Sequence, residues 1–141
     1  MNKTMQAIAD AVREKADFNR NTRDDWRTTT MYNVFERDGT VQVSYRGTQV
    51  AFVQADRNRV FFNTGGFRTV TTKRVLNAVL EGAGCNAQVF QEKGKWAIRR
   101  FNAETGATLN VCLFDSFDKF ALPLAIVGTG TLTESERLFN A

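Results

Sequence analysis

The sequence predicts an α+β fold in which hairpins form an antiparallel sheet and helices pack against it. Three observations carry this prediction. The chain opens with an apolar stripe of helical period, a stretch of alternating apolar and polar residues begins at Met31, and turn-forming pairs such as Asp38-Gly39 divide that stretch at short intervals. Successive strands joined by short turns pair antiparallel, and a sheet that buries one face under helices belongs to the α+β class.

The first segment predicts an amphipathic helix over about residues 4–16. Its apolar residues recur at i, i+3, i+4 and i+7 and form one stripe: Met5, Ile8, Ala9 and Val12. The connector over residues 17–30 is polar and rich in arginine. We expect it to be a surface loop that Phe18 and Trp26 anchor to the body of the protein.

Four short antiparallel strands are expected over residues 31–65. The Asp38-Gly39 pair predicts a tight turn between the first two strands, and residues 56–58 predict another turn. Strict alternation within the strands would place Val50 and Phe52 on the same face of the sheet.

A central helix is expected over about residues 72–80, capped by Thr71 or Thr72 and ended by Gly82. After it, Lys93-Gly94 predicts another hairpin, and a further strand is expected beyond the turn at residues 104–106.

The C-terminal part is expected to contribute three short elements. Residues 114–120 predict a helical turn or a small apolar cluster, and residues 122–127 predict a last strand. A short C-terminal helix is expected over residues 133–141, where Thr133 and Glu136 match a capping box. A chain of 141 residues with this pattern is expected to form a single globular domain over residues 1–141.

Composition argues against several kinds of chemistry. The chain has no histidine, which is the commonest metal ligand and general base, and it has two cysteines, Cys85 and Cys112. Two thiols fall short of a zinc site. The carboxylate pairs, such as Asp24-Asp25, lie in polar stretches that would not separate their pKa values as acid–base catalysis requires. We therefore expect no metal, no cofactor and no enzymatic activity.

The positive charge is concentrated in the middle of the chain. Residues 57–100 carry nine cationic and two acidic residues, a net charge of +7, whereas residues 1–56 are neutral and residues 101–141 carry −3. Aromatic residues lie between these cations, a combination typical of proteins that bind single-stranded nucleic acid. The candidate nucleic-acid contacts are Arg59, Arg68, Lys73, Arg74, Arg99 and Arg100. Because neighbours in a strand point to opposite faces, some of the aromatic residues must belong to the core, and the arginines could simply be solvated.

The start of the central helix has the composition of a phosphate-binding loop without its motif. Lys73 follows a threonine, so the P-loop pattern fails, and no glycine lies between Gly66 and Gly82, so the dinucleotide fingerprint fails. What remains is a helix start with hydroxyl groups at Thr71 and Thr72, where the backbone N–H groups and the helix dipole favour an anion. The pattern fits an anion-binding site and also fits an ordinary threonine cap.

The same part of the chain carries a specific string of residues. Two glycines and an aromatic residue precede a threonine-rich segment that ends in lysine, and a helix with Leu-Asn and a Gly-x-Trp turn follow. These positions are Gly65, Gly66, Phe67, Thr69, Thr71, Thr72, Lys73, Leu76, Asn77, Gly94 and Trp96. Over about residues 45–100 the chain thereby resembles short uncharacterised proteins of tailed bacteriophages, although the spacing after the lysine departs from their pattern. The resemblance implies a phage origin and no established activity.

No membrane segment is expected. No apolar run approaches the roughly 18 residues of a membrane helix, and the first 15 residues carry charges where a secretory signal would be apolar. With the phage resemblance, this predicts a location in the host bacterial cytoplasm.

The leading hypothesis is a small phage accessory protein that binds nucleic acid through residues 57–100. The alternative is a protein–protein interaction module, such as an inhibitor of a host protein or a virion component, that uses its phenylalanine-rich surface and the segment around Trp26.

Overall fold

The computed structural model describes residues 2–23, 29–64, 69–102, 104–113 and 119–123, and it confirms the α+β class. Two helices, one short 3-10 helix and nine strands follow one another within these residues. They are α1 (Lys3–Glu14), β1 (Phe18–Arg23), β2 (Thr29–Arg37), β3 (Thr40–Tyr45), β4 (Thr48–Gln54), η1 (Ala55–Arg57), β5 (Arg59–Asn63), α2 (Val70–Gly82), β6 (Ala87–Glu92), β7 (Lys95–Phe101), β8 (Thr108–Leu113) and β9 (Lys119–Pro123).

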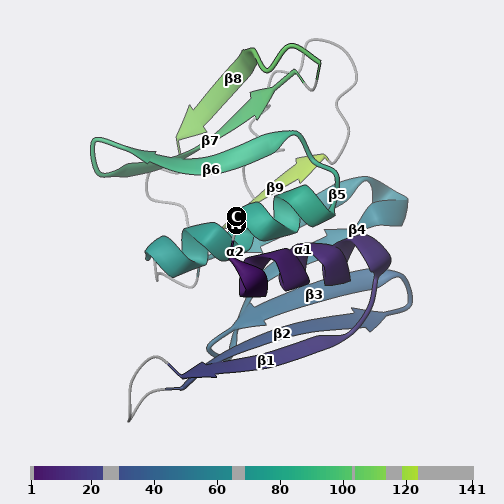
Figure 1. The fold of residues 1–141 in the computed structure, drawn as a ribbon. Helices are drawn as coiled ribbons and strands as arrows, with labels where there is room; N and C mark the ends of the chain where they lie inside the picture. The colour runs from purple at the N-terminus through teal and green to yellow at the C-terminus, as the bar shows by residue number, and fades with distance from the viewer. Residues whose placement is uncertain (1, 24–28, 65–68, 103, 114–118, 124–141) are drawn as a thin grey trace.

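The strands form two antiparallel sheets (Figure 1). Sheet A has the strand order β1-β2-β3-β4-β5-β9, and sheet B has the order β6-β7-β8. Helices α1 and α2 lie side by side against one face of sheet A, where α1 contacts β1 and β2 and α2 contacts β3 and β4. We call this the inner face of sheet A. Because α2 also contacts β6, it connects the two sheets.

Three hairpins use the same two-residue turn. Asp38-Gly39, Arg46-Gly47 and Lys93-Gly94 each have positive φ at both positions, between 51° and 81°. Positive φ at both central residues is the mark of the type I′ turn, whose twist matches that of paired strands. The predictions at Asp38-Gly39 and Lys93-Gly94 are therefore confirmed, and the Arg46-Gly47 turn between β3 and β4 adds a third.

The hydrophobic core lies between the helices and the inner faces of the sheets. The predicted stripe of α1 is buried, at Met5, Ile8, Ala9 and Val12. The buried side of α2 is also as predicted, with Val75, Leu76, Val79 and Leu80 at 0% exposure. Sheet A contributes mainly valines, whereas sheet B contributes Val89, Trp96 and Ile98.

Several element boundaries differ from the sequence predictions. The connector over residues 17–30 is not simply a loop, because Phe18–Arg23 form β1 and β2 begins at Thr29. The segment "FNRNTR" did not predict a strand because five of its six residues are polar. A polar composition suits an edge strand such as β1, which pairs with a neighbouring strand along one side. Phe18 anchors this segment by packing against the core, as expected, whereas Trp26 lies outside the described residues.

The central helix is longer than predicted, and the last described strand begins earlier than predicted. Helix α2 extends from Val70 to Gly82 rather than over residues 72–80. The strand expected at residues 122–127 overlaps β9 (Lys119–Pro123), which pairs with β5, and residues 124–127 lie outside the described residues. The predicted C-terminal helix at residues 133–141 lies outside the described residues.

A β-bulge changes which residues of β4 face the core. Val43 pairs with Ala51 whereas the next residue, Ser44, pairs with Gln49, so Val50 is the extra residue of β4. Val50 and Ala51 are both buried, and Phe52 points to the opposite face. The expectation that Val50 and Phe52 share a face was therefore wrong, because a bulge interrupts the alternation on which it rested.

Gly82 allows α1 and α2 to approach closely. A Cβ atom built at Gly82 would overlap the backbone oxygen of Ala9 and lie 2.9 Å from the Cβ atom of Val12. The obstacle at Ala9 is backbone, which cannot move aside as the end of a flexible side chain can. The helix pair therefore depends on the missing side chain at this position.

Asn77 attaches α2 to β6. Its side-chain amide donates a hydrogen bond to the carbonyl oxygen of Val89 at 2.9 Å, and its side-chain oxygen accepts one from the Val89 N–H at 2.7 Å. The Leu-Asn pair noted in the sequence thus has a structural role, with Leu76 in the core and Asn77 bound to the backbone of sheet B. Neither described helix is long and apolar enough to cross a bilayer.

We expect Gly82→Ala to lower the free energy of unfolding by about 1–3 kcal/mol, the usual cost of overpacking. Alanine favours a helix over glycine by about 1 kcal/mol, so the steric overlap must outweigh that gain. Urea unfolding followed by circular dichroism measures the change. Glu81→Ala, at the exposed neighbouring position, is the control and should stay within about 0.5 kcal/mol of the wild type. A Gly82→Ala protein at least as stable as the wild type would contradict the close approach.

We expect Asn77→Ala to cost about 1–3 kcal/mol, because the N–H and C=O groups of Val89 lose their partners while partly buried. The same unfolding measurement applies. Asn86→Ala removes an exposed amide just before β6 and serves as the control. Equal stability of the two variants would show that the Asn77 pairing contributes nothing.

Candidate nucleic-acid interface

The face of sheet A that points away from the helices carries a distinct set of side chains. We call it the outer face. Alternation along the strands and the pairing between them place on it Asn19 and Asn21 of β1, Met31, Asn33, Phe35 and Arg37 of β2, Thr40, Gln42 and Ser44 of β3, Gln49, Phe52 and Gln54 of β4, and Arg59, Phe61 and Asn63 of β5.

Register orders these side chains into three rows across the strands. The arginine row is Arg37, Thr40, Gln54 and Arg59. The phenylalanine row is Phe35, Gln42, Phe52 and Phe61. The amide row is Asn33, Ser44 and Gln49, and Asn63 lies two residues beyond Phe61 on β5. Residues far apart in sequence are thereby brought side by side.

The outer face is polar and positively charged, with aromatic rings along its middle. None of its described side chains is acidic; Asp38 and Asp56 lie beyond the arginine row, in the turn after β2 and in η1. Arg37 and Arg59 are both exposed, and neither forms a salt bridge with a described carboxylate. The guanidinium carbon of Arg37 lies 5.8 Å from the centre of the Phe35 ring, and Phe35 itself is 47% exposed.

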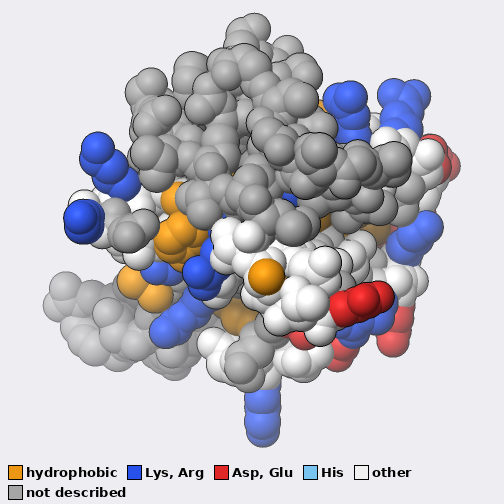
Figure 2. Space-filling model, turned by 90° about the horizontal axis from the view of Figure 1, so that it is seen from above, with side chains coloured by type: hydrophobic (Ala, Val, Ile, Leu, Met, Phe, Trp, Pro, Cys, Tyr) orange, Lys and Arg blue, Asp and Glu red, His pale blue; other side chains and the backbone are white. Residues whose placement is uncertain are grey.

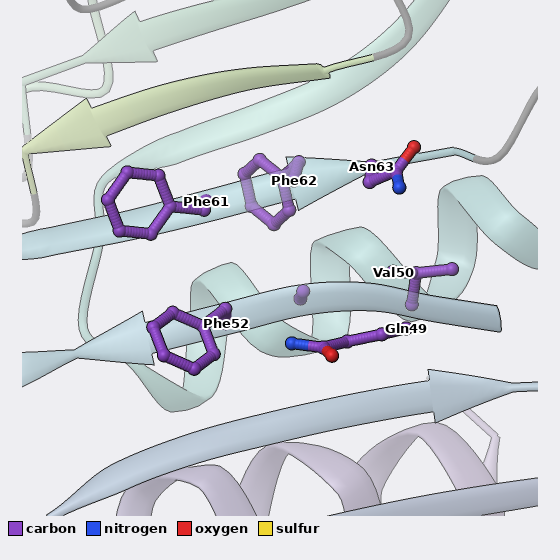
Figure 3. Close-up of a pocket in the computed structure, with 7 residues that line it drawn as sticks. Gln49, Val50, Phe52, Phe61, Phe62 and Asn63 are labelled. Atoms are coloured by element: carbon purple, nitrogen blue, oxygen red, sulfur yellow. The ribbon is translucent and has the colours of Figure 1, made fainter. Parts of the chain in front are cut away.

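A hollow of about 320 Å³ opens on the outer face between β4 and β5 (Figure 3). Phe52 and Phe61 lie next to each other at one end of it, with ring centres 6.0 Å apart and ring planes inclined by 41°. Gln49 and Asn63 lie toward its other end. Gln49 points outward because Val50 is the extra residue of the bulge; without the bulge the valine would take its place.

The start of α2 differs from the sequence prediction. Thr69, rather than Thr71 or Thr72, is the N-cap, and its hydroxyl oxygen accepts a hydrogen bond from the Thr72 N–H at 3.1 Å. Thr72 is fully buried, and its hydroxyl lies 3.0 Å from that of Thr69. The helix begins two residues earlier than expected because Thr69 supplies the capping oxygen.

A smaller cavity of about 250 Å³ adjoins this helix start. Thr69 and Thr72 line one side of it, and Tyr45, Arg46 and Thr48 from the β3–β4 hairpin line another. Lys73 lies in the first turn of α2 and is half-buried, and Arg74 follows it and is exposed. The hydroxyl groups of Thr69 and Thr72 already bond to each other, so the geometry fits a capped helix without a ligand.

The two predicted arginines of β7 occupy different environments. Arg99 lies 4.8 Å from the ring centre of Phe90, and its Nε donates a hydrogen bond to Gln88 at 2.9 Å. Arg100 is 1% exposed and contributes to the interior instead. The expectation that it extends an exposed basic patch was wrong, because alternation along β7 turns it toward the core.

Arg100 lies close to Cys85 in the interior. Burial raises the pKa of the Cys85 thiol above its ordinary value, although the positive charge of Arg100 and its hydrogen bond to the thiol partly counteract that rise in pKa. The described residues contain no group of three or more His, Cys, Asp or Glu side chains that could hold a metal ion.

The six predicted nucleic-acid contacts do not form one surface. Arg59 lies on the outer face of sheet A at the start of β5, whereas Lys73 and Arg74 follow the far end of that strand and lie on α2, which packs against the inner face. Arg99 lies on sheet B, Arg100 is buried, and Arg68 lies outside the described residues. Figure 2, a view from the side of sheet B, accordingly shows Lys and Arg side chains spread around the molecule.

Sequence reasoning missed most of the outer face. Phe35, Arg37 and Phe52 precede the basic segment at residues 57–100 and lie in a part of the chain with no net charge. One signal for these residues was present in the sequence. Phe35 and Arg37 lie two residues apart in a predicted strand, and the alternation of side chains along a strand places them on the same face. Pairing them with Arg59 and Phe61 requires the register of four strands.

Comparisons with known proteins yield a family. No curated protein and no solved structure matches the chain. The family model described as Kyanoviridae Gp96 protein matches residues 1–120, which include α1 as well as the stretch that resembles phage proteins. The chain therefore belongs to the Kyanoviridae Gp96 family and is a bacteriophage protein.

Proposed function

We propose that this phage protein binds nucleic acid without catalysing a reaction, and that the outer face of sheet A makes the contact. One observation carries the proposal: a row of phenylalanines runs beside a row with an arginine at each end, on a face where no described side chain is acidic. In the host cell, such binding would take place in the bacterial cytoplasm.

The arginine row supplies the electrostatic part of the interaction. Arg37 and Arg59 lie on β2 and β5, with two strands between them, so they can contact phosphates along one nucleic-acid backbone. Arginine presents a planar fork of donors that suits phosphate oxygens, and an exposed guanidinium that no described carboxylate binds is suited to that contact.

The phenylalanine and amide rows supply the remaining contacts. Aromatic rings on an exposed surface give bases a place to stack, and Asn and Gln side chains offer both donors and acceptors to base edges or sugars. A single nucleic-acid ligand would thus contact all three rows.

Binding of another protein is the second candidate function, and one observation favours it. Met31 and Phe35 on β2 are 48% and 47% exposed, and such side chains often mark protein interfaces. However, amides and arginines flank the phenylalanine row on both sides, so the apolar surface is a narrow stripe rather than a broad patch.

We expect the protein to bind a fluorescently labelled oligonucleotide more weakly as salt increases. In the double variant Arg37→Gln and Arg59→Gln, the slope of log K against log salt should become shallower by about 0.7–0.9 per lost phosphate contact. Fluorescence anisotropy at several salt concentrations measures both effects.

The double variant Lys73→Gln and Arg74→Gln is the matched control, because it removes the same charge from the start of α2. A larger loss in this control than in the sheet variant would move the interface to the helix start. No binding by the wild type at low salt would exclude the proposed function and leave protein binding as the better candidate.

A further inference from the structure

The outer face also indicates which form of nucleic acid it accepts. The hollow between β4 and β5 has aromatic rings at one end, Asn63 at the other and the amide of Gln49 extending along β4 toward Phe52, a combination of groups that matches the face and the edge of a nucleobase (Figure 3). The ring faces of Phe52 and Phe61 are suited to the flat face of a base. The exposed amide of Gln49 can both donate and accept a hydrogen bond at its edge, and Asn63 lines the hollow on β5.

The shape of the outer face excludes the usual recognition of base edges in the grooves of a duplex. A double helix exposes its base edges at the bottom of grooves that admit a helix or a two-stranded ribbon. The outer face belongs to a sheet of six strands, and its phenylalanines lie in the middle of that sheet rather than on a projecting element. A duplex laid on this face could contact Arg37 and Arg59 through its phosphates but would leave the rings and the hollow unused.

A single strand can use all three rows together. Adjacent strands lie about 4.8 Å apart, so Phe35 and Phe52, separated by β3, offer stacking positions about 9.6 Å apart. The arginine row runs parallel to the phenylalanine row, two residues along each strand. A chain of nucleotides that crosses the strands would therefore place bases over the phenylalanines and phosphates beside the arginines.

We propose that the outer face of sheet A binds single-stranded nucleic acid, with one unpaired base in the hollow between Gln49, Phe52, Phe61 and Asn63. This inference rests on the proposed function and specifies its ligand. The bulge at Val50 is part of the site, because it turns the amide of Gln49 toward the hollow.

The experiment measures binding of the full chain to a labelled 12-nucleotide single strand and to the duplex of the same sequence, by fluorescence anisotropy at low salt. We expect the single strand to bind more tightly than the duplex. Phe52→Leu and Phe61→Leu, which keep an apolar side chain and remove the ring, should each weaken binding of the single strand at least about fivefold. Phe90→Leu, at a half-buried position on β6 of sheet B, is the matched control and should not weaken it.

A second variant guards against a change in folding. Phe52→Trp retains a ring and should retain binding, and its added fluorescence should be quenched by the single strand. Circular dichroism spectra of all variants should match that of the wild type.

A competition with a nucleoside monophosphate distinguishes a strand from a free nucleotide, and we expect no displacement at concentrations equal to the nucleotide content of the strand.

The possible outcomes separate this inference from the function on which it rests. Binding of the duplex as tightly as the single strand, or equal affinities of the Phe52, Phe61 and Phe90 variants, would overturn the single-strand site while leaving nucleic-acid binding intact. Displacement by the monophosphate would assign the hollow to a free nucleotide. Absence of binding to either form would exclude the proposed function itself.

Discussion

The close contact between α1 and α2 determines how the rest of the chain is arranged. Gly82 lets the backbone of α2 meet that of α1 at Ala9, and the joined helices cover the inner face of sheet A. Helix α2 also binds the backbone of β6 through Asn77. Both sheets thus depend on a single helix, and the two helices leave the opposite face of sheet A for other contacts.

The sequence predicted the parts of the fold that depend on local periodicity. The stripe of α1, the buried side of α2 and the turns at Asp38-Gly39 and Lys93-Gly94 are all set by residues within a few positions of one another. Strand β1 was missed because its polar sequence has little strand preference of its own, and it is held by pairing with β2. That pairing is a tertiary contact and leaves no local signal in the sequence of β1.

The candidate site was harder to predict, because charge concentrated along a sequence need not be concentrated in space. The basic segment at residues 57–100 passes through a strand, a helix and a hairpin, and it distributes its cations over separate surfaces. Conversely, the three rows of the outer face gather side chains from four strands that span residues 31–63. Among the described residues of the predicted set, only Arg59 lies on it, and composition alone could not have paired Arg59 with Arg37.

The bulge at Val50 shows why the site requires the structure. Regular alternation would turn Val50 outward and Gln49 inward, which would put an amide in the core and an apolar side chain beside Phe52. The extra residue reverses both orientations, so that Val50 is buried and Gln49 reaches the outer face. The same bulge therefore keeps the valine in the core and the amide on the surface. A bulge that bends the strand also affects the space between β4 and β5, which is where the hollow beside Phe52 and Phe61 lies.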